Sequence, residues 1–216
     1  MRIVLASNNQ GKLRELKDLL SSDVEIMTAG ELGLELPEET GATFEENAFL
    51  KAHAIAEATK QIAVADDSGL EVDALHGAPG VRSARFAGEP SDDARNNALL
   101  LAKLTGVPAK QRTGRFQSVV AVVGPQGEAF SAHGSIEGEI LEEPRGSGGF
   151  GYDPLFLIDG YNRTMAELSL DEKNAISHRA RAFRGVVEHL TALLNTYNDC
   201  RVDGTDNRRS HIEVET

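Results

Sequence analysis

Two adjacent carboxylates, Asp66 and Asp67, directly follow the apolar run 62–65 and are followed by Ser68 and Gly69. The apolar run predicts a buried strand, and the next four residues predict a small turn at its carboxyl end. In open α/β sheets this is where ligands bind, and paired carboxylates there can bind Mg²⁺ or accept a proton from water. Taken alone, however, the four residues favour a simple capped turn.

A polar turn near the N-terminus could hold phosphate groups. It consists of Ser7, Asn8, Asn9, Gln10, Gly11 and Lys12. The turn separates a predicted strand from a predicted helix, and the free amides of a helix N-terminus attract anions. It is not a Walker loop, because Ala6 occupies a glycine position of that pattern and Leu13 occupies a Ser/Thr position. An Asn-rich turn with a solvated lysine is the alternative, which this segment alone slightly favours.

Further acidic and basic residues could join these two segments. Glu38 and Glu39 lie in a predicted loop. If that loop folds toward the two aspartates, three or four carboxylates converge, and such a cluster needs a cation or protonation to be stable. Lys51 belongs to a predicted helix, where exposure to solvent is the ordinary expectation. If it faces the same cleft, it supplies a second positive charge for phosphate.

A glycine-rich loop contains an aromatic residue followed by a carboxylate. Phe150 and Gly151 precede Tyr152, Asp153 and a proline. An aromatic ring in such a loop can stack on a nucleobase, and the Asp153 carboxylate can accept hydrogen bonds from a base. A tight loop whose phenylalanine packs into the core is an equally good explanation of this segment by itself.

The last group of candidate residues precedes the final helix. Lys173 and Ser177 are four residues apart, which predicts that they share one helical face. His178 and Arg179 could donate hydrogen bonds to a base carbonyl or to phosphate, whereas a charged helix surface is the alternative. The remaining histidines have no metal-ligand spacing, and no Ser or Cys nucleophile motif is present.

Hydrophobic periodicity predicts the elements that position these residues. Strands are expected at 2–6, 24–27, 62–65, 115–123, 129–133, 136–141 and 155–158. Helices are expected after residue 12, at 43–60, at 91–106 and after Ser169, and Thr43 and Ser91 are the predicted caps. An apolar stripe marks the last helix, namely Phe183, Val186, Val187, Leu190, Leu193, Leu194 and Tyr197.

This order of elements predicts an α/β fold. Alternating strands and helices at the start, followed by a hairpin section, indicate a mixed central β-sheet flanked by helices. We expect two lobes with a nucleotide-binding cleft between them. The predicted domain covers residues 1–197, and residues 198–216 form a polar, flexible C-terminal tail.

Composition narrows the classes of function. The chain has 216 residues, 40% of them hydrophobic, and a formal net charge of −12. The negative charge and the absence of a basic stripe argue against binding to nucleic acid or to an anionic membrane. A lone cysteine, Cys200, forms no internal disulfide, and no apolar run reaches the length of a membrane span. We therefore expect a cytoplasmic protein.

Seven motifs together resemble one family, the inosine triphosphate pyrophosphatases. They are Ser-Asn-Asn-x-Gly-Lys, Glu-Glu-Thr-Gly, Glu-Asn-Ala-x-x-Lys-Ala, Asp-Asp-Ser-Gly-Leu, Gly-Ala-Pro-Gly-Val-x-Ser-Ala-Arg, Gly-Gly-Phe-Gly-Tyr-Asp-Pro-x-Phe and Glu-Lys-x-x-x-Ser-His-Arg. The motifs occur in the family's order, and the resemblance covers residues 1 to about 194. Each motif is weak alone, whereas the series is highly specific. Ser7 replaces the threonine of many relatives and keeps the hydroxyl group.

The resemblance implies a Mg²⁺-dependent homodimer that hydrolyses ITP, dITP and XTP between the α and β phosphates. It implies that residues 7–12 and Lys51 hold the triphosphate, and that Asp67 is the catalytic residue and a metal ligand. The second metal ligand is Glu38 or Glu39, since the alignment is ambiguous by one residue. By the same resemblance, the substrate is also contacted by Ser68, Phe150, Gly151, Tyr152, Asp153, Lys173, His178 and Arg179.

Two other functions fit part of these observations. One is a house-cleaning pyrophosphatase for pyrimidine nucleoside triphosphates with a related cleft. The other is a regulatory protein that binds a nucleotide without turnover. A binding protein gains little from a costly group of carboxylates, which favours an enzyme.

Overall fold

The structure is a computed structural model, and it describes residues 2–19 and 24–202. One sheet in this part of the chain has the strand order β2-β1-β3-β4-β5-β6. Strand β1 is parallel to β2 and β3, whereas β3, β4, β5 and β6 pair antiparallel in sequence order. The predicted α/β fold with a mixed sheet is therefore confirmed. The strands are β1 (Arg2–Leu5), β2 (Glu25–Thr28), β3 (Ala63–Val72), β4 (Thr113–Val123), β5 (Ala129–Ile140) and β6 (Phe156–Ile158).

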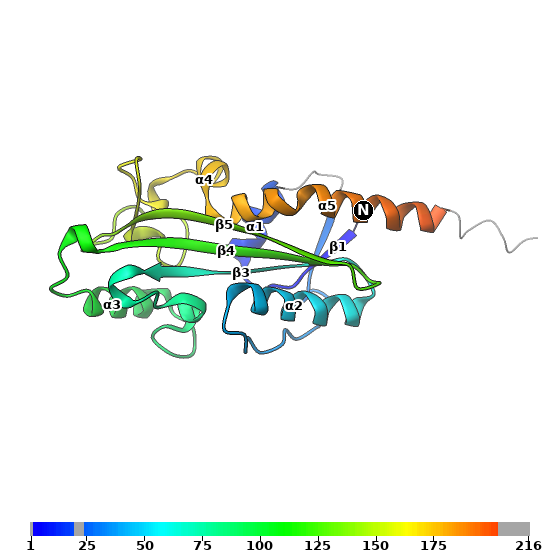
Figure 1. Ribbon diagram of the computed structural model, residues 1–216, viewed down its shortest axis with the longest axis horizontal. Coiled ribbons are helices and arrows are strands. Elements are labelled where there is room, and N and C mark those ends of the chain that lie inside the picture. Colours follow the sequence, from blue (N-terminus) through cyan, green and yellow to red (C-terminus); the bar gives the residue numbers. More distant parts are fainter. Residues whose placement is uncertain (1, 20–23, 203–216) are drawn as a thin grey trace, which may run out of the picture.

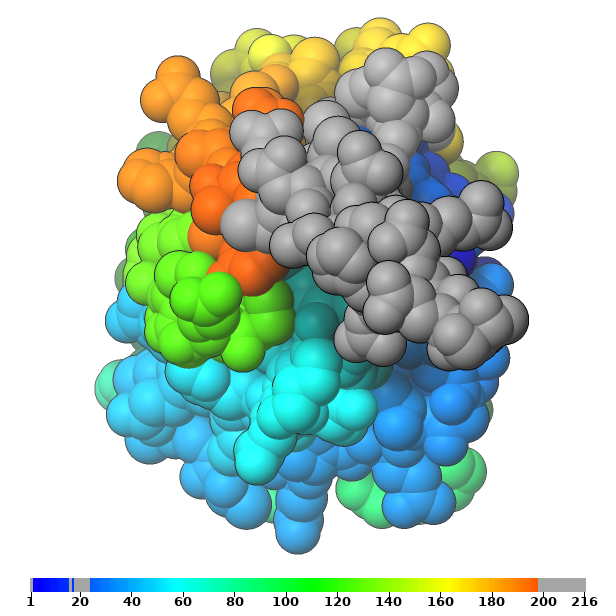
Figure 2. Space-filling view, turned by 90° about the vertical axis from the view of Figure 1, so that its right-hand side faces the viewer, coloured from blue at the N-terminus to red at the C-terminus, as the bar shows by residue number. Residues whose placement is uncertain are grey.

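Helices cover both faces of this sheet. In Figure 1, α2 and α3 lie below the long strands β3 to β5, and α4 and α5 lie above them. Figure 2 shows one end of the molecule, where the green β4–β5 turn lies between α5 (orange) and α2 (blue). The helices are α1 (Gln10–Leu19), α2 (Phe44–Thr59), α3 (Asp93–Lys103), α4 (Leu170–Ile176) and α5 (His178–Val202).

Side-chain caps fix where three of these helices begin. The hydroxyl of Thr43 accepts a hydrogen bond from the Glu46 amide, and that of Ser169 accepts one from the Glu172 amide. Both predicted helix starts are confirmed. The α3 cap, however, is Asp92 and not Ser91, whose hydroxyl donates to the Ala84 carbonyl instead.

Alternation along the strands divides the core into two layers. On one face, Ile3, Leu5 and Val64 pack with the predicted apolar stripe of α5. On the other face, Val4, Ala63 and Ala65 pack against α2. A third cluster, around Leu100 of α3 and Phe156 of β6, fills the opposite end of the molecule.

Strand β3 differs from its prediction at the most informative place. Residues 66–69 do not form a turn, because β3 continues without interruption from Ala63 to Val72. Its residues pair one by one with β4, and Asp66 and Asp67 lie opposite Val120 and Val119. This long cross-strand pairing outweighs the local turn preference of Asp, Ser and Gly. Strand β5 is likewise continuous, although two separate strands were predicted.

The end of the chain also departs from the predicted boundaries. Ser177 does not share a helix with Lys173, because it adopts an extended conformation between α4 and α5. Helix α5 runs to Val202, so the boundary expected after residue 197 falls within it. Residues 203–216 of the predicted tail lie outside the described residues, as does the side chain of Cys200. Within the described part, no helix is both long and apolar enough to cross a membrane.

Candidate active site

The candidate site begins where β1 ends beside β3. Strand β1 pairs with β3 only at Ala63 and Val64, so in the part of the chain that the structure describes β3 has no strand neighbour on that side from Asp66 onward. The polar turn 7–12 follows β1 directly into this gap. The Asp66 carbonyl, freed from strand pairing, accepts hydrogen bonds from Lys12 Nζ at 3.2 Å and Lys51 Nζ at 3.1 Å. The site therefore lies at the carboxyl end of a parallel pair, as expected for an α/β sheet.

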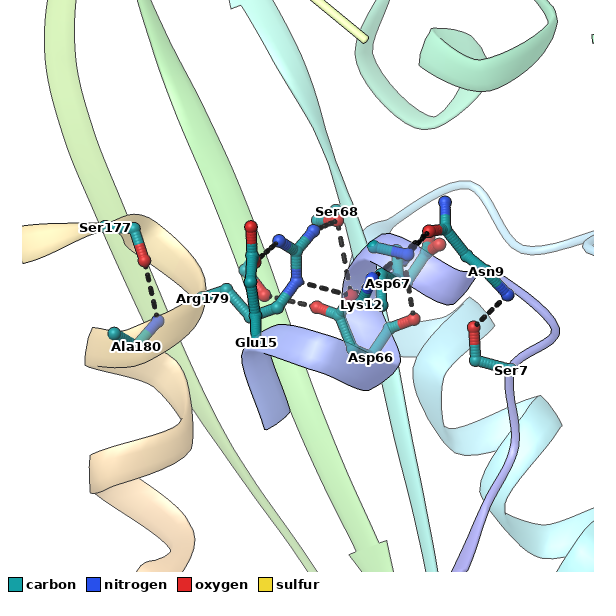
Figure 3. A network of polar contacts seen from close by, with 12 residues as sticks. Ser7, Asn9, Lys12, Glu15, Asp66, Asp67, Ser68, Ser177, Arg179 and Ala180 are labelled. Atoms are coloured by element: carbon teal, nitrogen blue, oxygen red, sulfur yellow. Dashed lines mark hydrogen bonds and ion pairs between the residues drawn. The ribbon is translucent and has the colours of Figure 1, made fainter. Parts of the chain in front are cut away.

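The Asp66 carboxylate is enclosed by cations (Figure 3). Lys12 Nζ lies 2.7 Å and Arg179 Nε 3.1 Å from its Oδ2, and Ser118 donates to its Oδ1. Burial opposes ionisation, but Lys12 and Arg179 outweigh it and hold the pKa of Asp66 far below its usual range. Asp66 is therefore a permanent counter-ion that fixes both cations in place.

Glu15 is a second buried counter-ion, which the sequence analysis did not identify. Its carboxylate contacts Lys173 Nζ at 2.8 Å and the Arg179 guanidinium. Despite burial, Arg179 and Lys173 hold the pKa of Glu15 below its ordinary value. The sequence feature that could have identified Glu15 is its position three residues after Lys12, on the same face of α1.

Asp67 points to the opposite face of β3, toward α2, and is less completely paired. Its Oδ1 accepts a hydrogen bond from Lys51 Nζ at 3.1 Å, whereas its buried Oδ2 has no partner among the described residues. Burial raises the pKa of Asp67, although Lys51 and Lys12 oppose the shift. A desolvated carboxylate oxygen without a partner can bind a cation or accept a proton.

The two loop glutamates have different surroundings. Glu39 lines the cleft and contacts Lys51 Nζ at 2.7 Å and Arg85 Nη2 at 3.0 Å, whereas Glu38 is exposed. Lys51 is buried and therefore does not take the ordinary solvent-facing position. Because of Asp67 and Glu39, the pKa of Lys51 is raised in spite of its burial. Lys51 thus joins the loop to β3.

The expected convergence of three or four carboxylates does not occur. In the described ranges, no group of three or more His, Cys, Asp or Glu side chains is arranged to hold a metal ion. The reason is geometric, because strand alternation turns Asp66 away from Asp67 and Glu38 faces solvent. Asp67 and Glu39, joined by Lys51, remain as the acidic pair at this end of the cleft.

Another part of the cleft combines an aromatic ring with buried cations. Lys173 Nζ lies 4.9 Å and the Arg179 guanidinium carbon 5.5 Å from the centre of the Phe150 ring. Asp153 accepts hydrogen bonds from the Phe150 amide at 2.9 Å and from Lys173 Nζ at 2.7 Å. Burial raises the pKa of Asp153, against the opposing effect of Lys173. Phe150 is only partly buried, so it does not simply fill the core.

His178 is buried at the start of α5 and faces this end of the cleft. Its ring stacks on Phe116 with centroids 4.9 Å apart and an interplanar angle of 13°. Burial, reinforced by Arg179, places the pKa of His178 well below its ordinary value, so the imidazole is neutral at pH 7. Its Nδ1 has no hydrogen-bond partner among the described residues. A ligand group could therefore complete its hydrogen bonding.

The polar turn is organised by its own side chains. Asn9 Oδ1 accepts hydrogen bonds from the Gly11 amide at 2.8 Å and the Lys12 amide at 3.1 Å, and Ser7 Oγ accepts one from the Asn9 amide. Two amides expected to face phosphate are therefore already satisfied within the turn. Asn8 and Gln10 are exposed and Ser7 is buried. Positive charge from Lys12 is the main feature that this turn brings to the cleft.

One cleft brings most of the predicted residues together. Its lining includes Asn9, Lys12, Glu39, Asp67, Ser68, Phe150, Gly151, Tyr152, Asp153, Lys173, His178 and Arg179. The predicted residues outside that lining are Ser7, Asn8, Gln10, Gly11, Glu38 and Lys51. Sequence reasoning gave no role to Ser83, Asp93, Asn96 and Phe116, which also line the cleft. Ser83 lies within one of the seven motifs, whereas the other three lie outside them.

Comparisons with known proteins match this chain over most of its length. A model of the Ham1 family matches residues 3–189. The chain is 54% identical to a dITP/XTP pyrophosphatase of Desulforamulus reducens over 195 residues, which cover 89% of this chain and 97% of that protein. It is 48% identical to a dITP/XTP pyrophosphatase of Bacillus subtilis, covering 88% and 96% of the two chains. The solved structure of a HAM1 protein from Coxiella burnetii matches with a TM-score of 0.81 and 42% identity, covering 89% of this chain and 99% of the other.

Proposed function

This chain belongs to the Ham1 family, and from that premise we propose that it is a nucleoside-triphosphate pyrophosphatase for non-standard purine nucleotides. The reaction converts ITP, dITP or XTP to the monophosphate and pyrophosphate, which cleanses the nucleotide pool. One observation carries the proposal. One cleft is lined by Lys12, Asp67 and Glu39, beside which phosphates would lie, and by Phe150 and His178, beside which a base would lie.

Mg²⁺ is part of this proposal, and the residues present fit it. The buried, unpartnered Oδ2 of Asp67 and the nearby Glu39 carboxylate supply the hard oxygen ligands that Mg²⁺ requires. Asp67 and Glu39 would therefore hold the ion. When bound, Mg²⁺ supplies stabilisation of negative charge on the phosphate oxygens. The exposure of Glu38 leaves Glu39 as the second proposed ligand.

The phosphate end of the cleft suits charge neutralisation and proton transfer. Lys12 and Lys51 would balance the triphosphate charge, and Asp66 and Glu39 keep these lysines in position. Asp67 would accept the proton of the attacking water. Without a bound cation, burial raises its pKa, which makes it a stronger base than an ordinary aspartate, whereas a bound cation would oppose this shift.

The base end of the cleft offers the contacts that a 6-oxopurine needs. Phe150 would stack on the ring, and His178 and Arg179 would donate hydrogen bonds toward the 6-oxo oxygen. Adenine carries an amino group at this position, so it would leave buried donors unpaired. Replacement of His178 or Arg179 by Ala should therefore lower the preference for ITP over ATP. An unchanged ratio of the two kcat/KM values would place base recognition elsewhere.

Pyrophosphate release with Mg²⁺ across ITP, XTP, dITP, GTP, ATP, UTP and dTTP tests the proposed function. We expect turnover of ITP, XTP and dITP to exceed that of the other four. Fastest turnover of UTP or dTTP would support a pyrimidine-directed enzyme, and binding without release would support a regulatory protein. Both results would overturn the proposal.

Three further properties belong to the proposal. We propose a homodimer, a cytoplasmic location and no binding to nucleic acid, in keeping with the family resemblance and the net charge of −12. Light scattering coupled to size-exclusion chromatography measures the mass directly. A mass near the 23.2 kDa of one chain would contradict the dimer.

A further inference from the structure

We infer that Asp93 and Asn97 of α3 are positioning residues that hold Phe150 at the base end of the cleft and thereby set the affinity for purine nucleotides. This inference rests on the proposed function and extends it to a helix that the motifs do not include. Asp93 lies in the first turn of α3 and Asn97 one turn later, so both side chains are on the same helical face.

Both residues bind the peptide groups of Gly151, the residue directly after Phe150. The Gly151 amide donates to Asp93 Oδ2 at 2.7 Å, and Asn97 Nδ2 donates to the Gly151 carbonyl at 3.0 Å. The first is a hydrogen bond to a charged acceptor, the stronger class. Helix α3 therefore holds the backbone beside Phe150, because it binds both the amide and the carbonyl of Gly151.

The loop that carries Phe150 needs support from outside. Gly146, Gly149 and Gly151 have φ values of +81°, +73° and +62°, in the region where glycine is favoured and the chain has the most conformational freedom to lose. Asp153 holds the Phe150 amide from within the loop and is itself bound by Lys173 of α4. The contacts from α3 join this loop to a packed helix.

The same helix also holds a second wall of the cleft. Asn96 Oδ1 accepts a hydrogen bond from the Ala87 amide at 2.8 Å, and its Nδ2 donates to the Ala84 carbonyl at 3.0 Å. Ala84 and Phe150 both line the cleft. Three residues of α3 thus join two walls from distant parts of the chain. Helix α3 therefore sets the width of the space between these walls, where a purine ring must fit.

Calorimetric binding to the Asp93→Ala/Asn97→Ala variant, with Mg²⁺ present, tests this role. Two ligands separate the two ends of the cleft, namely an inosine triphosphate analogue with a non-hydrolysable α,β linkage and inorganic tripolyphosphate. Loss of both hydrogen bonds should raise Kd for the analogue by about tenfold. Kd for tripolyphosphate, which has no base, should change by less than about twofold. In turnover of ITP, KM should rise while kcat changes little.

Two further variants serve as controls. Asp93→Asn keeps an oxygen acceptor for the Gly151 amide, so it should restore analogue binding to within about threefold of wild type. Glu188→Ala removes an exposed acid from α5 and should leave both affinities unchanged. An unchanged analogue affinity in the double variant would overturn the inference. Equal loss of tripolyphosphate binding would also overturn it, since that result indicates general support of the fold. Wild-type protein that releases no pyrophosphate from ITP would instead overturn the proposed function.

Discussion

The neighbouring aspartates of β3 lie on its two faces and have opposite environments. Toward α5, Asp66 has hydrogen bonds or ion pairs to both of its carboxylate oxygens, and its pKa is strongly lowered. Toward α2, Asp67 shares Lys51 with Glu39, and its pKa is raised. One of its oxygens has no partner within residues 2–19 and 24–202. The same side chain is therefore a fixed counter-ion on one face and an under-satisfied ligand on the other.

This difference gives two adjacent residues different roles, since Asp66 supports stability and Asp67 supports the proposed chemistry. A buried carboxylate with a full set of partners keeps its cations in place and does not change its protonation state. A buried carboxylate with an open oxygen gains most when a cation or a proton arrives. We therefore expect substitutions on the Asp66 face to affect folding, and substitutions on the Asp67 face to affect turnover.

Asp67→Asn should have the largest effect, a fall in kcat of about 10³-fold or more, because the proposed proton acceptor and metal ligand is lost. Thermal stability at pH 7 should be unchanged or higher. A raised pKa means that folding disfavours the ionised form, so a neutral amide removes a cost that is present above that pKa. This gain offsets the loss of one of the two carboxylate partners of Lys51, which keeps Glu39. Pyrophosphate release and thermal unfolding measure the two effects. An active Asp67→Asn enzyme would remove the basis of the comparison.

Asp66→Asn should do the reverse and destabilise the fold. Lys12 and Arg179 would lose a buried counter-charge, and breaking such a pair costs about 3–5 kcal/mol. Urea unfolding at pH 7, with wild type and Asp67→Asn side by side, gives the free energies of unfolding. Equal stability of the two variants would show that the faces of β3 do not differ in this way.

Glu39→Gln and Glu38→Gln form a matched pair on the loop facing Asp67. Only Glu39 contacts Lys51, so Glu39→Gln should raise the Mg²⁺ concentration for half-maximal activity by about 10- to 100-fold. Glu38→Gln should leave that concentration unchanged, because Glu38 is exposed. A Mg²⁺ titration of ITP turnover checks both variants. A larger effect of Glu38→Gln would assign the second metal ligand to Glu38.

Acid titration should show a smaller difference between the two faces, namely a difference between the pH at which activity is lost and the pH at which the fold is lost. Asp67 has a raised pKa, so it becomes protonated, and activity falls, at a pH above the ordinary aspartate value of 3.8. Asp66 has a lowered pKa, so its stabilising contribution is present above 3.8 and is lost only as the pH falls further. Activity should therefore disappear reversibly before the fold does. ITP turnover and circular dichroism over the same pH series test this order, and coincident transitions would contradict it.

Added Mg²⁺ gives an independent check on the acid transition. A cation bound by Asp67 favours its ionised form, so the fall in activity should move to lower pH as the Mg²⁺ concentration rises. The unfolding transition, to which Asp66 contributes, should move much less. An acid transition independent of Mg²⁺ would assign the titration to another group.

Much of the fold and the site could be predicted from local patterns. Apolar alternation and the capping residues Thr43 and Ser169 indicated the mixed sheet and the helix starts. The polar turn, the two aspartates and the loop around Phe150 identified most residues of the cleft. These features are readable because periodicity and capping depend on residues only a few positions apart.

The tertiary structure alone decided what each polar residue does. Pairing with β4 extends β3 through Asp66 and Asp67 and turns their carboxylates to opposite faces. Lys12, together with Arg179 at 113 positions from Asp66, then keeps that carboxylate ionised, and Glu15 gains its role from the same arginine. Charge environment depends on distance in space and on burial, and neither is encoded in local sequence spacing. The residues of the site were therefore predictable from the sequence, whereas the division between counter-ions and candidate catalytic groups required the fold.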